Sequence, residues 1–315
     1  MNAAPMRGRA WPLLWPAFAG AAQALSIAWP GSGQALAWLQ VLSLTLLAAG
    51  LAPMARQSIG GPFAGPSPVK RAAWFGGVFA TAWLAGSFWW LYVSMHHVGG
   101  LPAPLAVLAV LALAGALALY YAAASAVWVG LARGWVAQRP GLASVLFAAL
   151  WTLAELMRGR WFTGFPWGAG GYAHLESSLA AYAPWVGVYG IGAISACLAM
   201  GVPLLISSFM AGRTQAWLIL SFSLFMVAVL IPMGLQHAAP QFTQAAGTLK
   251  VRLLQGNIPQ DEKFIPGQGV QQALSWYAEQ LLANSEPLVV TPETAIPVLP
   301  QQLAPAYWQV LKDKY

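Results

Sequence analysis

Residues 103–132 read APLAVLAVLALAGALALYYAAASAVWVGLA, a stretch without one charged side chain. The hydrocarbon core of a bilayer is about 30 Å thick, and roughly 20 apolar residues in a helix cross it. The stretch is therefore long enough to span a membrane, and its surplus length predicts a helix that tilts or contains a break. It indicates a helical membrane protein.

Six shorter apolar runs accompany this one, and together they predict an all-α membrane domain of about seven transmembrane helices. The seven runs are 11–29, 34–54, 72–93, 103–132, 141–157, 184–206 and 215–234. The first is the weakest, because Pro12 and Pro16 lie near its start. Residues 7–28 also match a secretory signal peptide, in which Arg7 and Arg9 precede an apolar stretch of the right length. A signal anchor, retained as the first helix, fits the six later runs better.

Charge divides the chain into two parts. The whole chain is 59% hydrophobic and 7% charged, whereas a soluble domain carries about 25% charged residues. Residues 1–249 hold ten basic and two acidic residues, while residues 250–315 hold five basic and six acidic residues. We therefore expect an integral membrane domain over residues 1–236, a linker over 237–249 and a domain of soluble composition over 250–315.

The same composition excludes several classes of protein. High hydrophobicity with little charge excludes intrinsic disorder. A single cysteine, Cys197, excludes a disulfide scaffold. The net charge of +7 comes from cations placed between apolar runs, and nucleic-acid binding would instead require basic residues clustered on a soluble surface.

The positions of the cations predict an orientation in the membrane. With the N-terminus in the cytoplasm, eight of the ten cations of the membrane domain fall in cytoplasmic segments, and the reverse orientation leaves two there. The eight are Arg7, Arg9, Arg56, Lys70, Arg71, Arg133, Arg139 and Arg213. Seven spans then place the residues after about 236 on the periplasmic side of a bacterial inner membrane.

The first outer loop contains His96 and His97. Neighbouring histidines are candidate metal ligands, but neighbouring side chains point apart, and no acid or cysteine is close in sequence. The pattern favours an interfacial turn, and we expect neither a metal nor a cofactor.

The second outer loop, residues 155–168, reads ELMRGRWFTGFPWG. A charge in the middle of a bilayer costs on the order of 3 kcal/mol, so Glu155 requires a partner or a function. Arg158 lies three residues further along the same helix face and is a candidate partner for it. Alternatively, Arg158 or Arg160 binds a lipid phosphate at the outer leaflet, beside aromatic residues typical of a membrane interface. The candidate lipid-binding residues are Arg158, Arg160, Trp161, Phe165 and Trp167.

Residues 250–315 predict alternating strands and helices. Residues 250–256 and 287–291 have strand patterns, and residues 268–284 have apolar side chains at helical spacing. This order predicts a right-handed βαβ unit with parallel strands. The second strand leads directly into Glu293, at the strand end where catalytic groups gather in open α/β sheets. Glu293 is therefore a candidate functional carboxylate, with a surface glutamate in a loop as the alternative.

Three stretches, in this order, resemble the bacterial apolipoprotein N-acyltransferases. Residues 151–167 (WTLAELMRGRWFTGFPW) resemble the outer-face loop of that family. Residues 253–260 (LLQGNIPQ) resemble the first strand of its nitrilase-like domain. Residues 289–297 (VVTPETAIP) resemble the strand and turn that carry its catalytic glutamate. The resemblance covers the membrane domain and the start of the second domain.

The resemblance implies an inner-membrane enzyme that moves an acyl chain from a phospholipid to the amino group of the N-terminal diacylglyceryl-cysteine of an apolipoprotein. It implies an αββα nitrilase-like second domain and a Glu-Lys-Cys triad. In that triad the cysteine carries the acyl group as a thioester, a lysine stabilises the oxyanion, and the glutamate is the general base. Glu293 matches the glutamate. The expected partners are the phospholipid donor and the apolipoprotein acceptor, without nucleic acid, and we expect a monomer.

The sequence departs from the family pattern at the other two members of the triad. Lys312 and Lys314 come earlier than the family lysine. Cys197 lies inside the predicted span 184–206, where an apolar setting leaves a thiol unreactive. We therefore expect residues 250–315 to be an incomplete, truncated nitrilase-like domain, and the 315 residues alone to be inactive.

Two other readings remain. The first is a multi-pass transporter or scaffold with a small periplasmic cap. Such a protein requires ionisable groups in several spans, or interrupted helices at matching positions. The membrane domain holds few acids, which argues against this hypothesis. A membrane-tethered amidase of the nitrilase type explains Glu293 but leaves seven spans without a purpose.

Overall fold

The computed structural model describes residues 11–57, 67–237, 244–260 and 262–314. Arg7 and Arg9, which contribute to the predicted orientation, and residues 238–243 of the predicted linker lie outside these ranges. The chain forms two compact units, Met1–Pro240 and Gln241–Tyr315, which we describe separately.

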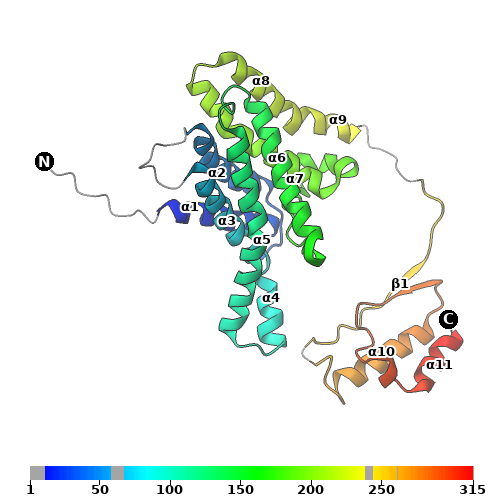
Figure 1. The fold of residues 1–315 in the computed structure, drawn as a ribbon. Helices are drawn as coiled ribbons and strands as arrows, with labels where there is room; N and C mark the ends of the chain where they lie inside the picture. The colour runs from blue at the N-terminus through cyan, green and yellow to red at the C-terminus, as the bar shows by residue number, and fades with distance from the viewer. Residues whose placement is uncertain (1–10, 58–66, 238–243, 261, 315) are drawn as a thin grey trace. The chain divides into compact units, whose positions relative to one another are not determined.

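The first unit is helical (Figure 1). Its α-helices are α1 (Trp11–Ile27), α2 (Ala37–Arg56), α3 (Pro68–Ser87), α4 (Trp89–Val93), α5 (Ala103–Ala132), α6 (Pro140–Arg160), α7 (Ala183–Met210), α8 (Thr214–Phe225) and α9 (Ile231–His237). Short π and 3-10 turns are η1 (Ser94–Val98), η2 (Trp161–Thr163), η3 (Gly170–His174), η4 (Ser178–Tyr182) and η5 (Met226–Leu230). The run 103–132 forms one unbroken helix, about 45 Å long at 1.5 Å per residue, so the break that its length allowed is not found.

The number of membrane spans differs from the predicted seven. Among the described residues, five helical segments are long and apolar enough to cross a membrane: Ala37–Arg56, Ala103–Ala132, Pro140–Thr163, Ser178–Met210 and Thr214–Gln236. A sixth span results if Pro68–Ser87 and Trp89–Val98, bent by 53°, count as one. The 17 residues of α1 extend only about 26 Å, which is shorter than the hydrocarbon core. Multi-pass membrane character is therefore supported, whereas seven spans are not confirmed.

Aromatic side chains form the centre of this unit, where α3, α5 and α6 meet. The ring of Tyr121 lies 5.1 Å from that of Trp83 and 4.8 Å from that of Trp151. All three side chains are buried. Edge-to-face aromatic pairs at such distances stabilise a core beyond the area that they bury, so this cluster fixes the spacing of three helices.

Glycine allows α1 to approach α3 closely. A Cβ atom on Gly20 would lie 2.0 Å from the carbonyl oxygen of Phe79. Backbone atoms cannot move aside as a side chain can, so only glycine fits at this crossing. Membrane helices commonly use small residues in this way, because no hydrophobic effect drives helices together inside lipid.

The second unit contains two strands and two α-helices. Strands β1 (Val251–Leu253) and β2 (Leu288–Val290) are parallel, with Val251 opposite Leu288 and Leu253 opposite Val290. Helix α10 (Gly269–Ala283) lies between them in sequence; η6 (Pro300–Gln302) and α11 (Pro305–Lys314) follow. The predicted strand–helix–strand order and parallel pairing are confirmed. The nitrilase-like αββα architecture stays a prediction.

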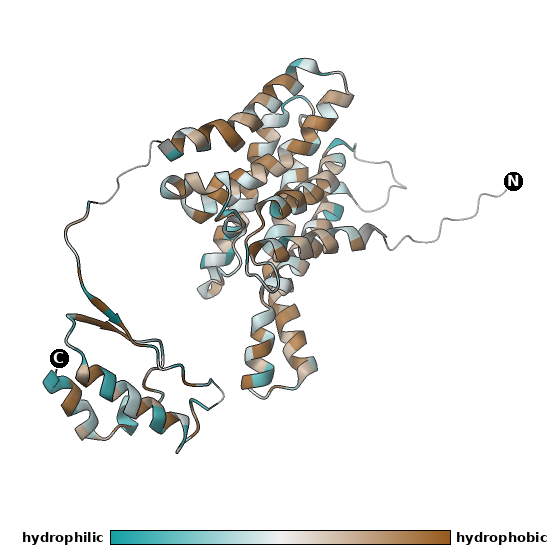
Figure 2. Ribbon diagram, turned by 180° about the vertical axis from the view of Figure 1, so that it is seen from behind, coloured by the Kyte–Doolittle hydropathy of each residue, from teal (hydrophilic) through white to brown (hydrophobic). Residues whose placement is uncertain are grey.

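The second unit has a small core of its own. Leu254, Ala273, Tyr277 and Ala295 are buried together. Figure 2 shows hydrophilic and hydrophobic residues mixed along α10, whereas hydrophobic residues dominate most helices of the first unit. Leu253 is 75% exposed and Val290 is 44% exposed, so apolar side chains of the two-stranded sheet are left uncovered within this unit.

The tight α1–α3 crossing gives a stability prediction. We expect Gly20→Ala to lower the free energy of unfolding by about 1–3 kcal/mol, because the added methyl group overlaps backbone atoms. The measurement is the thermal unfolding midpoint in detergent, followed by labelling of the half-buried Cys197 with a thiol-reactive dye. Gly115→Ala is the control, since a Cβ there meets no atom within 4 Å. Equal midpoints for the two variants would contradict the prediction.

Candidate functional site

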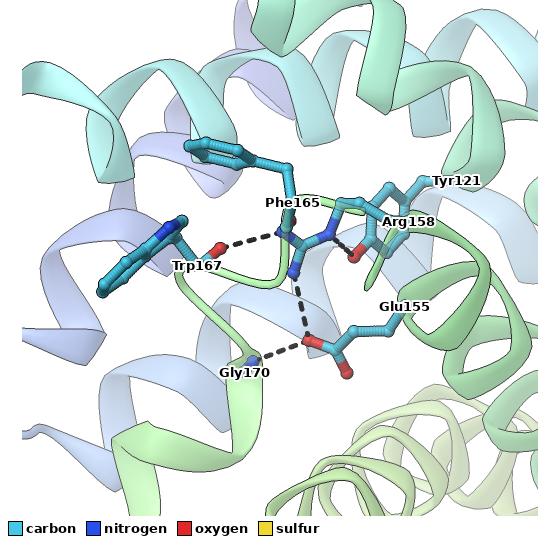
Figure 3. Close-up of polar contacts among 6 residues, drawn as sticks. All are labelled: Tyr121, Glu155, Arg158, Phe165, Trp167 and Gly170. Carbon is cyan, nitrogen blue, oxygen red and sulfur yellow. Dashed lines mark hydrogen bonds and ion pairs between the residues drawn. The ribbon is translucent and has the colours of Figure 1, made fainter. Parts of the chain in front are cut away.

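Glu155 and Arg158 form a buried centre at the end of α6 (Figure 3). Arg158 Nη2 lies 3.9 Å from Glu155 Oε1, and both side chains are at most 1% exposed. The pairing that their helical spacing predicted is therefore confirmed. Because the pair is enclosed, each charge must find its remaining partners inside the protein.

Arg158 binds both the core and the loop that follows α6. Its Nε donates to Tyr121 Oη at 3.0 Å, and its Nη1 donates to the carbonyl oxygens of Phe165 and Trp167 at 2.7 and 2.8 Å. Glu155 Oε1 accepts from the backbone N–H of Gly170 at 2.8 Å. The ion pair therefore fixes the loop at three positions between residues 165 and 170.

The backbone of this loop is unusual. Phe162 and Thr163 have φ angles of 53° and 71°, in the left-handed region that non-glycine residues rarely adopt. Gly164 follows with φ 77°, and a Cβ there would lie 2.1 Å from the carbonyl oxygen of Gly159. Strained residues persist only where the surroundings over-determine them, and they gather at functional sites. The Arg158 contacts supply that constraint here.

Most predicted lipid-binding residues project from this loop. Arg160 is exposed, and Trp161 and Trp167 are 55% and 58% exposed. Phe165 is half-buried, with its ring 4.8 Å from that of Phe88. Arg158 differs from the others, because its guanidinium is buried and bonded to protein oxygens. Of the predicted lipid-binding residues, Arg158 is therefore internal, whereas Arg160, Trp161 and Trp167 are exposed.

A second polar cluster joins the loop region to α2 and α7. The amide oxygen of Gln40 accepts from Ser195 Oγ and, with the proton on Nε2, from His174 at 3.0 Å. Nδ1 of His174 lies 3.0 Å from Ser177 Oγ. Burial lowers the pKa of His174 from 6.5 to about 4, so its imidazole is neutral at physiological pH. Nothing in the sequence predicted this cluster, since its members are up to 155 residues apart.

His96 and His97 of the predicted first outer loop, and the single cysteine Cys197, belong to neither of these two polar clusters. His96 Nδ1 lies 2.8 Å from the carbonyl oxygen of Leu101, and its ring is 4.8 Å from that of His97. Cys197 lies within α7 and packs against the hydrophobic core of the first unit.

In the second unit, Glu293 lies beside a cleft at the carboxyl ends of β1 and β2. The cleft has a volume of about 400 Å³. Its lining includes Gln255, Asn257, Lys263, Tyr277, Thr291 and Pro292. Glu293 follows Pro292 directly, and its side chain is exposed. This is the position at which parallel strands present catalytic groups.

Lys263 holds the turn that carries Glu293. Its Nζ donates to the carbonyl oxygen of Glu293 at 3.3 Å and to Thr294 Oγ1 at 2.5 Å. Thr294 has a φ of 57°, so the lysine stabilises a turn that is itself strained. No sequence pattern predicted a role for Lys263, and its place shortly after the stretch 253–260 is the one signal that could have indicated it.

Comparisons with known proteins agree with the resemblance seen in the sequence. The family model described as "Apolipoprotein N-acyltransferase N-terminal domain" matches residues 24–201. An apolipoprotein N-acyltransferase of Verminephrobacter eiseniae is 48% identical over 97% of this chain and 55% of its own length. That of Ralstonia nicotianae is 44% identical over 85% of this chain and 48% of its own length. An apolipoprotein N-acyltransferase of Pseudomonas putida is 36% identical over 87% of this chain and 54% of its own length. The chain spans about half the length of these relatives.

The buried ion pair gives a prediction for stability. We expect Arg158→Met to lower the free energy of unfolding by about 3–5 kcal/mol, because Glu155 is left as a buried charge without its partner. The double variant with Glu155→Gln should recover part of this loss, since it removes the uncompensated charge. Thermal unfolding in detergent measures both. Arg160→Met, at an exposed neighbour, should leave the midpoint nearly unchanged; an equal fall in both single variants would count against the prediction.

The buried imidazole gives a prediction for pH. Between pH 6.5 and about 4 the unfolded chain binds a proton at His174 that the folded chain does not. Stability therefore falls as the pH is lowered through this window, by on the order of 3 kcal/mol. Circular dichroism melting between pH 4 and 7 measures the slope. His174→Gln should flatten it, whereas His97→Gln, at an exposed histidine, should not. Identical slopes in the two variants would refute the assignment.

Proposed function

Because the chain belongs to the apolipoprotein N-acyltransferase family, we propose that it acts in lipoprotein maturation. The reaction transfers an acyl chain from a phospholipid to the amino group of an apolipoprotein whose N-terminal cysteine already carries a diacylglyceryl group. Glu293 supports this proposal most directly, since it follows a parallel strand at the edge of a cleft. Its turn is held by a lysine rather than left free in solvent.

In the proposed reaction Glu293 is the general base of a Glu-Lys-Cys triad. It takes the proton of a cysteine thiol, and the thiolate attacks the ester carbonyl of the phospholipid. The lysine of the triad stabilises the oxyanion, and collapse releases a lysophospholipid and leaves a thioester. The amine of the apolipoprotein then attacks the thioester, which restores the thiol and yields the amide.

Neither the thiol nor the lysine of this triad is assigned within residues 1–315. Cys197 is the single cysteine, and it packs inside the membrane unit. Lys263 binds the Glu293 turn through its backbone, which suits a positioning role rather than a contact with the reacting carbonyl. We therefore expect residues 1–315 alone to lack turnover.

The loop after α6 suits contact with the phospholipid donor. Trp161 and Trp167 are exposed, and tryptophan favours the membrane interface. Arg160 is also exposed, and its guanidinium can donate hydrogen bonds to a phosphate group. In this proposal Arg158 acts from inside the protein by holding the loop, and Phe165 anchors it against Phe88. The proposed setting is a bacterial inner membrane, with the N-terminus cytoplasmic, the second unit periplasmic and the protein monomeric.

The test uses a strain depleted of its own N-acyltransferase. Residues 1–315 are expressed alone, and also joined to the part of the Verminephrobacter eiseniae relative that lies beyond the matched region. Mass spectrometry of a lipoprotein N-terminus distinguishes two acyl chains from three. We expect the third chain with the fusion and not with residues 1–315 alone. Turnover by residues 1–315, or an acyl group on Cys197, would contradict the proposed triad.

The role of Glu293 is tested in the same fusion. We expect Glu293→Gln to lower thioester formation by at least about 100-fold, because an amide cannot accept the thiol proton. Membrane insertion should be unchanged. Glu279→Gln alters an exposed glutamate on α10 and serves as the matched control. Normal thioester yield in Glu293→Gln would remove this residue from the mechanism.

A further inference from the structure

The end of the membrane unit opposite the 161–170 loop carries only positive charge among the described residues. Helix α6 begins there at Pro140 and reaches the loop about 30 Å further along. The charged side chains near this end are Arg56, Lys70, Arg71, Arg133, Arg139 and Arg213. The acids of the unit, Glu155 and Glu176, lie near or beyond the far end of α6.

Two of these arginines share a hollow of about 210 Å³. Arg56 ends α2, and Arg213 lies in the turn between α7 and α8. The hollow is also lined by Ala137, Pro140 and Ser208. Arg213 Nη1 donates to the carbonyl oxygen of Ala137, which fixes this guanidinium at the rim. Residues from three separate helix ends thus converge on one small space.

The charges around this hollow are unbalanced. Among the described residues Glu155–Arg158 is the one ion pair, so neither Arg56 nor Arg213 has a carboxylate partner. The start of α6 adds a partial positive charge, since the first N–H groups of a helix have no acceptor within it. Arg56 and Arg213 are both exposed, and an anion held between two guanidinium groups and a helix N-terminus would be attracted by all three.

We propose that this hollow binds a phosphate group. A guanidinium offers parallel N–H donors that match phosphate oxygens, which favours phosphate over a halide. The hollow lies where the ends of α2, α6 and α7 meet. Each of these helices belongs to a segment long and apolar enough to cross a membrane, and the ends of such segments lie near lipid headgroups. The phosphate belongs either to a phospholipid headgroup or to a soluble phosphate. This site is separate from the proposed acyl-donor loop, which lies at the other end of α6.

The test uses purified residues 1–315 and does not depend on acyl transfer. In one arm, native mass spectrometry counts phosphatidylglycerol retained by the protein from nanodiscs. In the other, calorimetry measures binding of inorganic phosphate in detergent. In each arm where the wild type binds, we expect Arg56→Gln and Arg213→Gln each to weaken binding by about fivefold or more. Loss in the lipid arm identifies a headgroup, and loss in the calorimetry arm identifies soluble phosphate.

Matched variants separate binding from folding. Arg71→Gln is the control, because Arg71 lies at the same end but bonds to Gln57 at 3.1 Å and does not line the hollow. Arg56→Lys and Arg213→Lys keep the charge but lose the parallel donors, so their binding should lie between that of the wild type and that of the glutamine variants. The side chain of Arg56 has no hydrogen bond to protein among those found in the described residues, so its replacement tests the site even if Arg213→Gln misfolds. Equal binding by the wild type and the double glutamine variant in both arms would overturn the proposal.

Discussion

The burial of the Glu155–Arg158 pair is the constraint on which the loop after α6 depends. Two charges removed from water cost several kcal/mol each unless their geometry is good and their other bonding groups are satisfied. Here the carbonyl oxygens of Phe165 and Trp167 accept from Arg158, and the N–H of Gly170 donates to Glu155. Nη2 of Arg158 has no hydrogen bond among the described residues and contacts Glu155 at 3.9 Å. The loop conformation and the ion pair therefore stabilise each other.

This dependence explains how aromatic side chains stay exposed on a strained backbone. Phe162, at φ 53°, is 92% exposed, so its own contacts cannot hold the turn. The constraint acts from the inside, through Arg158 and its bond to Tyr121, which belongs to the aromatic core of α3, α5 and α6. Rigidity is thus transmitted from the core to an outward-facing loop, an arrangement suited to presenting a fixed surface to lipid.

The sequence predicted the features that depend on local periodicity. The uncharged run 103–132 is one helix, Glu155 meets Arg158 at i+3, and two strand patterns flanking a helix pattern form a parallel pair. Features that depend on distant residues were not predictable in this way. Gln40 meets His174 across 134 positions, and Lys263 meets the Glu293 turn across 30. The predicted count of seven spans is not confirmed, because five helical segments among the described residues qualify as spans, or six if the bent pair Pro68–Ser87 and Trp89–Val98 counts as one.

The two ends of α6 show that the acceptors within reach decide what an arginine does. Arg158 has a carboxylate, a hydroxyl and two carbonyl oxygens around it, so its charge is used internally and its replacement should act on stability. Arg213 has one carbonyl oxygen, and Arg56 has none among the contacts found. Their charges are therefore available to an external anion. The residue type is the same at both ends, and the difference lies in the oxygen atoms that the fold brings close.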